Sequence, residues 1–156
     1  GRLMQYDTPQ QVYLHPKNLF TAQYVGDPAM NFVEGSVSTL EGITRIECPF
    51  FSTQYNTHIP GLNGHLQKKV LFGIRPEELT IQQPNGDSVS FQAKIYAVEG
   101  YGDYFLVSLT IKDLIWKMVI VGDIGTVDLH SNEWITIYFS KNRMHFIDPS
   151  TEEVLL

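Results

Sequence analysis

The sequence predicts a mainly β fold, a small barrel or sandwich, preceded by a short two-helix segment. Three observations predict this fold. Residues that start and stop helices cluster near the N-terminus. Beyond Asn31, apolar side chains alternate with polar ones in several runs, which is the period of a strand with one buried face. Turn-forming residues separate these runs at short intervals, as in small all-β domains.

Two short helices are expected in the first 26 residues. Thr8 can cap the free amides of a first helix, and Pro9 suits its first turn. Pro16 disfavours helical geometry at the residue before it, so this helix should end there. A second helix is expected from Asn18, with Gly26 as its C-terminal stop.

Strands are expected after the helices. Alternation is clearest at 91–97, 105–111 and 135–139, and turn residues occur at 84–87, 100–103 and 140–143. The stretch 48–66 shows only short apolar pairs and Gly-containing turns, so irregular strands and loops are expected there. We therefore predict a boundary near residue 30, between a helical segment at 1–30 and a β domain at 31–156.

Composition limits the possible functions. The 156 residues are 43% hydrophobic and 18% charged, which is typical of a globular chain with one core or two small ones. The formal net charge is −6. Nucleic-acid binding needs clustered Lys and Arg, and the nearest approach to a cluster is Lys68 and Lys69. We therefore expect no nucleic-acid partner.

The chain shows no targeting or membrane signal. No apolar run approaches the roughly 20 residues of a membrane span, and Gln5, Tyr6 and Asp7 interrupt any apolar stretch at the N-terminus. Cys48 is the single cysteine, which fits a reducing compartment. We expect a cytoplasmic protein that reaches a membrane only through partners. The chain begins without Met in what resembles a strand, so we also expect it to be a piece of something larger.

Catalytic and metal-binding motifs are missing from the sequence. There is no P-loop and no G-x-S-x-G elbow. Cys48 precedes Pro49 and resembles a small apolar residue more than an activated thiol. The histidines lack the spacing of a metal site, although two of them could meet across a loop; they are His15, His58, His65, His130 and His145. We expect no catalytic residue, metal or cofactor in this chain.

Aromatic side chains leave a binding function open. Exposed aromatics on a small barrel can stack on single-stranded nucleic acid or on a sugar. The candidates are Tyr101, Tyr104, Trp116 and Trp134. The negative charge opposes nucleic acid, and Trp116 lies in an apolar strand where core packing is the simpler interpretation. For Tyr101, in a turn, both interpretations stay open.

Four segments in order resemble the ATP-binding subunits of bacterial sugar importers of the maltose and glycerol-phosphate type. The segment GRLMQYDTP at 1–9 resembles the family's G-R-[IL]-x-Q-x-G-T-P, with Asp7 in place of Gly. Residues 16–32 resemble P-x-N-x-F-V-A…[IV]-G-S-P-x-M-N-[FL]. GIRPE at 73–77 matches G-[IV]-R-P-E, and MHFID at 144–148 resembles the closing h-L-F-D segment.

This resemblance implies a specific architecture and role. The β part would be an oligonucleotide-binding (OB) type barrel of the TOBE class, acting as a non-catalytic regulatory and dimerisation domain. The residues at 1–30 would be the tail of an ATPase domain, which would bind ATP and Mg²⁺. The partners would be a second copy of the subunit, membrane-spanning permease subunits, and possible regulatory proteins. The subunit would lie at the inner face of the cell membrane.

An alternative function is a small-ligand sensor for a sugar or an oxyanion. The residues to test first are Arg75, Glu77, Gly100, Tyr101, Gly102 and Asp103. The competing interpretation of Arg75 is a structural contact that fixes the turn at Pro76. A stand-alone enzyme is a third class, and no set of catalytic residues supports it. The transported solute cannot be inferred from these residues.

Overall fold

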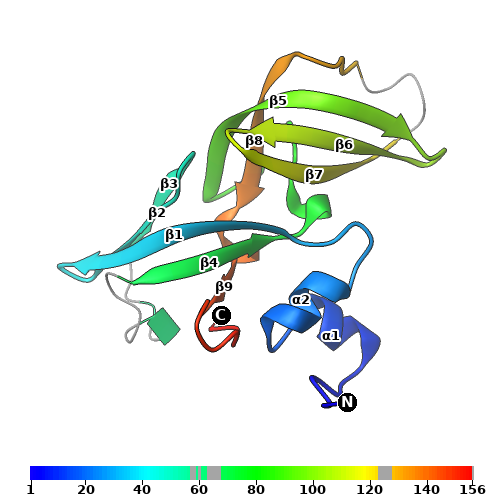
Figure 1. Ribbon diagram of the computed structural model, residues 1–156. Helices are drawn as coiled ribbons and strands as arrows, with labels where there is room; N and C mark the ends of the chain where they lie inside the picture. Colours follow the sequence, from blue (N-terminus) through cyan, green and yellow to red (C-terminus); the bar gives the residue numbers. More distant parts are fainter. Residues whose placement is uncertain (57–58, 60, 63–67, 123–127, 156) are drawn as a thin grey trace. The chain divides into compact units, whose positions relative to one another are not determined.

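A computed structural model describes residues 1–56, 59, 61–62, 68–122 and 128–155 (Figure 1). The fold is mainly β, with two short helices before the first strand, which confirms the predicted fold class. The chain forms two compact units. The first unit comprises Gly1–Gly73 with Met144–Leu156, and the second comprises Ile74–Arg143. The chain changes from helix to strand at residue 31, while the domain boundary proposed there stays a prediction.

Both predicted helices form where their capping residues indicate. Helix α1 spans Pro9–Leu14, and the side chain of Thr8 accepts a hydrogen bond from the amide of Gln11 at 3.3 Å. Helix α2 spans Leu19–Tyr24, and Asn18 Oδ1 accepts from the amide of Thr21 at 2.9 Å. These side chains satisfy amides that the helices leave free.

The first unit contains a five-stranded sheet in the order β3-β2-β1-β4-β9. Its strands are β1 (Asn31–Leu40), β2 (Ile43–Glu47), β3 (Ser52–Tyr55), β4 (Lys69–Ile74) and β9 (His145–Ile147). The pairs β1–β2, β2–β3 and β4–β9 are antiparallel. Strands β2 and β3 lie at residues where the sequence showed no clear pattern or only irregular strands were expected.

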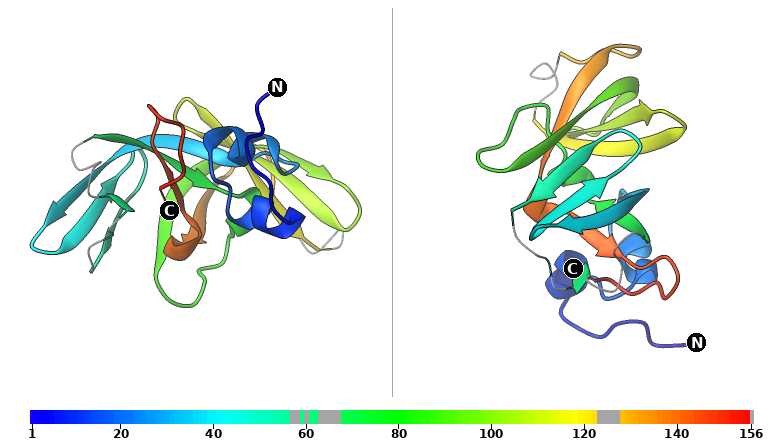
Figure 2. Two further views of the ribbon diagram at one scale, coloured as in Figure 1. Left: turned by 90° about the horizontal axis from the view of Figure 1, so that it is seen from below. Right: turned by 90° about the vertical axis from the view of Figure 1, so that its left-hand side faces the viewer.

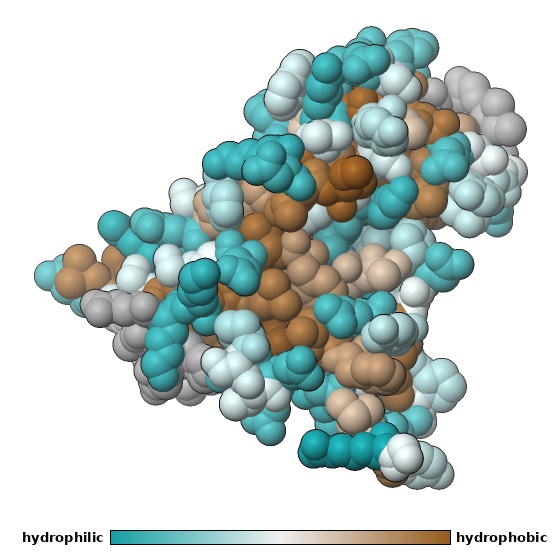
Figure 3. Space-filling model, viewed as in Figure 1, coloured by the Kyte–Doolittle hydropathy of each residue, from teal (hydrophilic) through white to brown (hydrophobic). Residues whose placement is uncertain are grey.

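The C-terminal segment ties the helices to this sheet. The amide of Leu19 donates to the carbonyl of Glu152, and the amide of Val154 donates to the carbonyl of Lys17. Ala22, Met30 and Ile147 form a buried cluster at this point. Figure 2 shows the helices and the C-terminal segment side by side in both views. Apolar side chains remain on the surface around α1 and α2 (Figure 3), among them Phe20 and Leu14.

Aromatic residues lie at the centre of the first unit's core. Phe72 is fully buried, and its ring meets that of Phe146 edge-on at 5.4 Å. Gly35 allows the close approach of β1 to this core. A Cβ there would overlap the backbone carbonyl of Glu47 and lie 2.8 Å from both Cys48 Sγ and the ring of Phe72. A side chain at position 35 is therefore incompatible with this packing.

The second unit contains a four-stranded antiparallel sheet in the order β7-β6-β5-β8. Its strands are β5 (Ser88–Gly100), β6 (Tyr104–Ile111), β7 (Leu114–Val121) and β8 (Trp134–Ser140). Two short 3₁₀ helices, η2 (Pro76–Glu78) and η3 (Lys141–Arg143), also belong to it. η2 packs against β7.

The alternation in the sequence marks the two faces of this sheet. Along β5 the side chains of Val89, Phe91, Ala93 and Ile95 are buried, whereas the residues between them are more exposed. Trp116 on β7 is 2% exposed and meets the ring of Phe91 edge-on at 5.5 Å. Trp116 is therefore a core residue, as the sequence indicated.

Candidate functional site

Two of the residues predicted to contact a ligand lie at η2. Arg75 is the residue before the helix, and its carbonyl accepts a hydrogen bond from the amide of Glu78. Its side chain is 3% exposed, and this burial lowers the pKa of the Arg75 guanidinium. Burial also raises the pKa of the Glu77 carboxyl, and the neighbouring charge of Glu78 adds to the rise. The buried side chain of Arg75 suits internal contacts more readily than direct binding from solvent, whereas the side chain of Glu77 is exposed.

The other predicted residues form the turn between β5 and β6. The amide of Tyr101 donates to the carbonyl of Tyr104 at 2.8 Å, which closes the turn. Gly102 has a φ of 94°, a conformation that glycine adopts without strain. The rings of Tyr101 and Tyr104 stack with centroids 5.1 Å apart and planes 6° apart. Gly100, Tyr101, Gly102 and Asp103 thus lie together on an exposed turn, whereas Arg75 directly precedes η2 and Glu77 lies within it.

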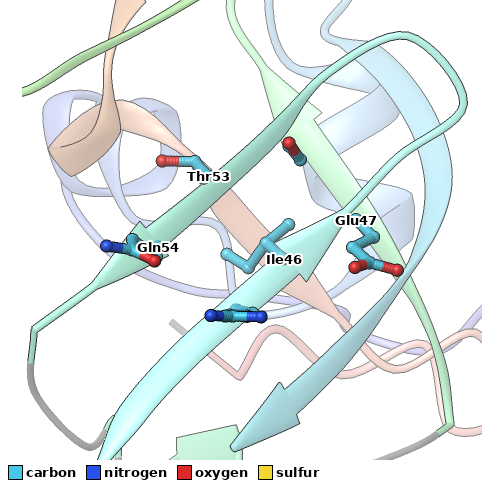
Figure 4. Close-up of a pocket in the computed structure, with 6 residues that line it drawn as sticks. Ile46, Glu47, Thr53 and Gln54 are labelled. Carbon is cyan, nitrogen blue, oxygen red and sulfur yellow. The ribbon is translucent and has the colours of Figure 1, made fainter.

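A hollow of about 350 Å³ that the sequence did not predict lies on strands β2 and β3. Its lining residues are Arg45, Ile46, Glu47, Ser52, Thr53 and Gln54. The register places Arg45 opposite Gln54 and Glu47 opposite Ser52, and all four are exposed. Ile46 lies between them in sequence and is fully buried. Figure 4 shows Ile46 and Glu47 on β2 beside Thr53 and Gln54 on β3.

The same polar face continues onto β1. Ser38 pairs with Arg45, and Ser36 pairs with Glu47, and both serines are exposed. The face therefore carries two cross-strand rows, one with a cation and one with an anion. The only sequence signal for it was the brief alternation of Thr44 and Ile46 with charged neighbours, which is too short to indicate a strand by itself.

The described residues offer little for covalent or metal chemistry. Burial raises the pKa of the Cys48 thiol from 9.0 to about 12, so it is protonated near neutral pH and a poor nucleophile. Within the described part of the chain, no group of three or more His, Cys, Asp or Glu side chains could hold a metal ion. His58 and His65 lie outside the described residues.

Comparison with protein families finds a match over part of the chain. Residues 26–79, which include strands β1 to β4, match the family model of the MalK OB fold domain. A solved structure of the molybdate-binding protein ModG, with molybdate bound, covers 74% of this chain and 94% of its own, with a TM-score of 0.52. The sequence identity is 8%, so this likeness concerns the fold.

Sequence relatives extend the match to nearly the whole chain. The oligosaccharides import ATP-binding protein MsmX of Bacillus subtilis (strain 168) is 31% identical over 159 residues, covering 97% of this chain. The xylose/arabinose import ATP-binding protein XacK of Haloferax volcanii is 29% identical over 166 residues, covering 99%. The chain is therefore similar over most of its length to part of the ATP-binding proteins of ABC sugar importers, the family that the motifs resemble, and its residues 26–79 match the MalK OB fold domain.

The chain spans less than half of these relatives, 41% of MsmX and 39% of XacK. Among the described residues, no helix is both long enough and apolar enough to cross a membrane.

Proposed function

We propose that this chain is the non-catalytic regulatory and dimerisation part of the ATP-binding subunit of an ABC importer for carbohydrates or sugar phosphates. The observation that carries the proposal is the match of residues 26–79 to the MalK OB fold domain. The similarity to MsmX covers 97% of the chain, and the similar proteins include one named for oligosaccharide import and one named for xylose/arabinose import. In this proposal ATP and Mg²⁺ bind to a separate ATPase domain of the same subunit. That domain contacts the permease subunits and holds the protein at the cytoplasmic face of the membrane.

A permanent contact between two such parts would serve the transport cycle. Two ATPase domains must separate and rejoin in each cycle, and a second contact keeps their effective concentration high while they are apart. The domain that makes this contact needs a stable surface more than a catalytic group. Sheets with well-packed cores, such as the one centred on Phe72, provide such a surface.

We place the self-contact on the polar face of β1, β2 and β3. A twofold contact uses the same patch on both copies, so the patch must complement itself. Arg45 and Glu47 are exposed neighbours two residues apart on one face, about 7 Å along the strand. A twofold axis between them would bring the arginine of each copy to the glutamate of the other. Opposite charges on one patch are the arrangement that such symmetry requires.

Charge reversal tests this contact. We expect the chain to dimerise in light scattering and Arg45→Glu to shift it to monomer, because four acidic groups would then meet across the axis. The double reversal Arg45→Glu with Glu47→Arg should restore the dimer, since it exchanges the partners without changing the net charge. A chain that stays monomeric at millimolar concentration, or a double variant that behaves like the single one, would refute the contact.

The regulatory role is tested separately in the complete subunit. Arg45→Glu in that subunit should lower sugar uptake while leaving the expression level unchanged. Unchanged uptake with a monomeric chain would remove both the dimerisation and the regulatory proposal.

A second candidate function is sensing of a sugar or an oxyanion. The stacked rings of Tyr101 and Tyr104 on an exposed turn favour it, because stacked aromatic faces are suited to apolar sugar surfaces. Titration calorimetry with maltose and with molybdate tests it. Heat that saturates with one of them and is lost in Tyr101→Ala supports a sensor at this turn, and no heat with either removes the Tyr101 turn as its site.

A further inference from the structure

The outer face of the second unit's sheet carries a row of side chains that the core does not explain. The register aligns Trp134 on β8 with Lys94 on β5, Lys94 with Thr110 on β6, and Thr110 with Ile115 on β7. Their neighbours along the strands, Ile95, Leu109 and Trp116, are buried. The row therefore lies on the face opposite the core.

Two aromatic side chains stand out from this face. Trp134 is 67% exposed, and Tyr96, two residues beyond Lys94 on β5, is also 67% exposed. A tryptophan that is 67% exposed forgoes much of the stabilisation that burying its ring would give. Exposed aromatic side chains gathered on one face of a protein are a common mark of a binding surface.

Backbone pairing fixes where the side chains of Trp134 and Tyr96 leave the sheet. The β5–β6 register shifts between Ile95 and Ala97, so Tyr96 lies at a bulge, a feature that redirects side chains and is frequent near binding sites. The amide of Ile95 donates to the carbonyl of Glu133 at 2.8 Å, and the amide of Asn132 donates to the carbonyl of Ile95 at 2.7 Å. These two hydrogen bonds hold the start of β8 beside the bulge. Both rings project from sheet strands and have only two side-chain torsions each to fix on binding.

The polar groups around the rings favour a neutral ligand rich in hydroxyls. Lys94 supplies donors in the row itself, and the hydroxyl of Thr110 both donates and accepts. Lys94 is the one charged residue of this four-residue row, and a single cation is too few to bind a polyanion, which needs clustered Lys and Arg. The net charge of −6 further opposes nucleic acid, whose backbone requires clustered positive charge.

We propose that Trp134 and Tyr96 form a stacking platform for a neutral oligosaccharide on the outer face of the β5–β8 sheet. The rings would contact the apolar faces of successive sugar units, and Lys94 and Thr110 would bind their hydroxyl groups. OB folds are known to bind oligosaccharides as well as oligonucleotides. The proposal deepens the sensor function and rests on it, because it assigns that function a ligand class and a site other than the Tyr101 turn.

The two tryptophans make the site measurable without a label. Trp134 is 67% exposed and Trp116 is 2% exposed, so a neutral quencher such as acrylamide reaches mainly Trp134. We expect maltotetraose to protect the 156-residue chain from quenching, whereas Trp134→Phe, which leaves only the buried indole, should show no protection. Oligothymidylate is the nucleic-acid probe, and it should give no protection.

Calorimetry with maltotetraose then assigns the site. Trp134→Ala and Tyr96→Ala should each weaken binding by about tenfold, in line with the loss of one stacked ring. Tyr24→Ala is the matched control, because Tyr24 is 73% exposed but belongs to the first unit. Its affinity for maltotetraose should equal that of the unchanged chain.

The outcomes separate the site from the function. Binding that Tyr101→Ala abolishes and Trp134→Ala leaves intact would overturn this platform while keeping the sensor function. Absence of binding to maltotetraose, xylotetraose and maltose would overturn both. Binding of oligothymidylate in place of the sugars would overturn the ligand class, and a dimer that Trp134→Ala dissociates would reassign the face to self-contact.

Discussion

The two units of this protein arrange their exposed surfaces in different ways. In the second unit, four strands place apolar residues on one face of the sheet. The opposite face carries the exposed side chains of Trp134 and Tyr96. In the first unit shorter strands enclose an aromatic core around Phe72, and the exposed face of β2 carries the paired charges of Arg45 and Glu47. We propose different uses for these surfaces, self-contact for the charged face of the first unit and ligand stacking for the aromatic face of the second.

Core truncations test whether the two units are also separate in stability. Phe72→Ala in the first unit and Phe139→Ala in the second should each cost about 3–5 kcal/mol, because both rings are fully buried. Both tryptophans lie in the second unit, so their fluorescence follows that unit, whereas circular dichroism follows both.

If the units unfold independently, Phe72→Ala should lower a transition seen by circular dichroism and leave the fluorescence midpoint unchanged. Phe139→Ala should lower the fluorescence midpoint. Equal shifts of both signals in both variants would show one cooperative unit and would end the comparison.

A smaller effect is expected at the glycines of the first unit. Gly35→Ala should destabilise it by about 1–3 kcal/mol, because the new Cβ meets the backbone carbonyl of Glu47, which cannot move without disturbing β2. Gly73→Ala should cost less, since the nearest atom is the flexible sulfur of Met30 at 2.5 Å. Urea unfolding measures both, with Ser36→Ala as the exposed control. A larger loss of unfolding free energy in Gly73→Ala than in Gly35→Ala would contradict this packing.

An effect that is absent at neutral pH is an alkaline sensitivity of the first unit. Burial raises the pKa of Cys48 from 9.0 to about 12, so between these values the folded protein binds the thiol proton more tightly than the unfolded chain does. The resulting stabilisation is complete below pH 9 and is lost as the pH rises toward 12.

Cys48→Ala should therefore make the stability of the first unit fall less steeply above pH 9, as measured by urea unfolding at several pH values. The slope seen by tryptophan fluorescence in the second unit should not change. Identical slopes for the variant and the unchanged chain would show that Cys48 is not buried as described.

Local signals in the sequence were sufficient for much of this protein. Thr8 and Asn18 marked both helix starts because a cap acts on amides only two or three residues away. The alternation from Phe91 to Ile95 fixed the faces of β5, since side-chain direction in a strand depends only on the backbone. The motifs at 16–32 and 73–77 were sufficient to indicate the family.

The tertiary structure alone decided which exposed residues became neighbours. Arg45 faces Gln54, and Trp134 faces Lys94 across 40 residues of sequence, because strand register is set by packing and pairing between distant segments. Arg75 was a ligand candidate in the sequence, and only the fold shows that its side chain is buried. The sequence by itself thus indicated most of the elements and the resemblance to importer ATP-binding proteins, whereas the juxtaposition of side chains on each face required contacts between segments that no local pattern encodes.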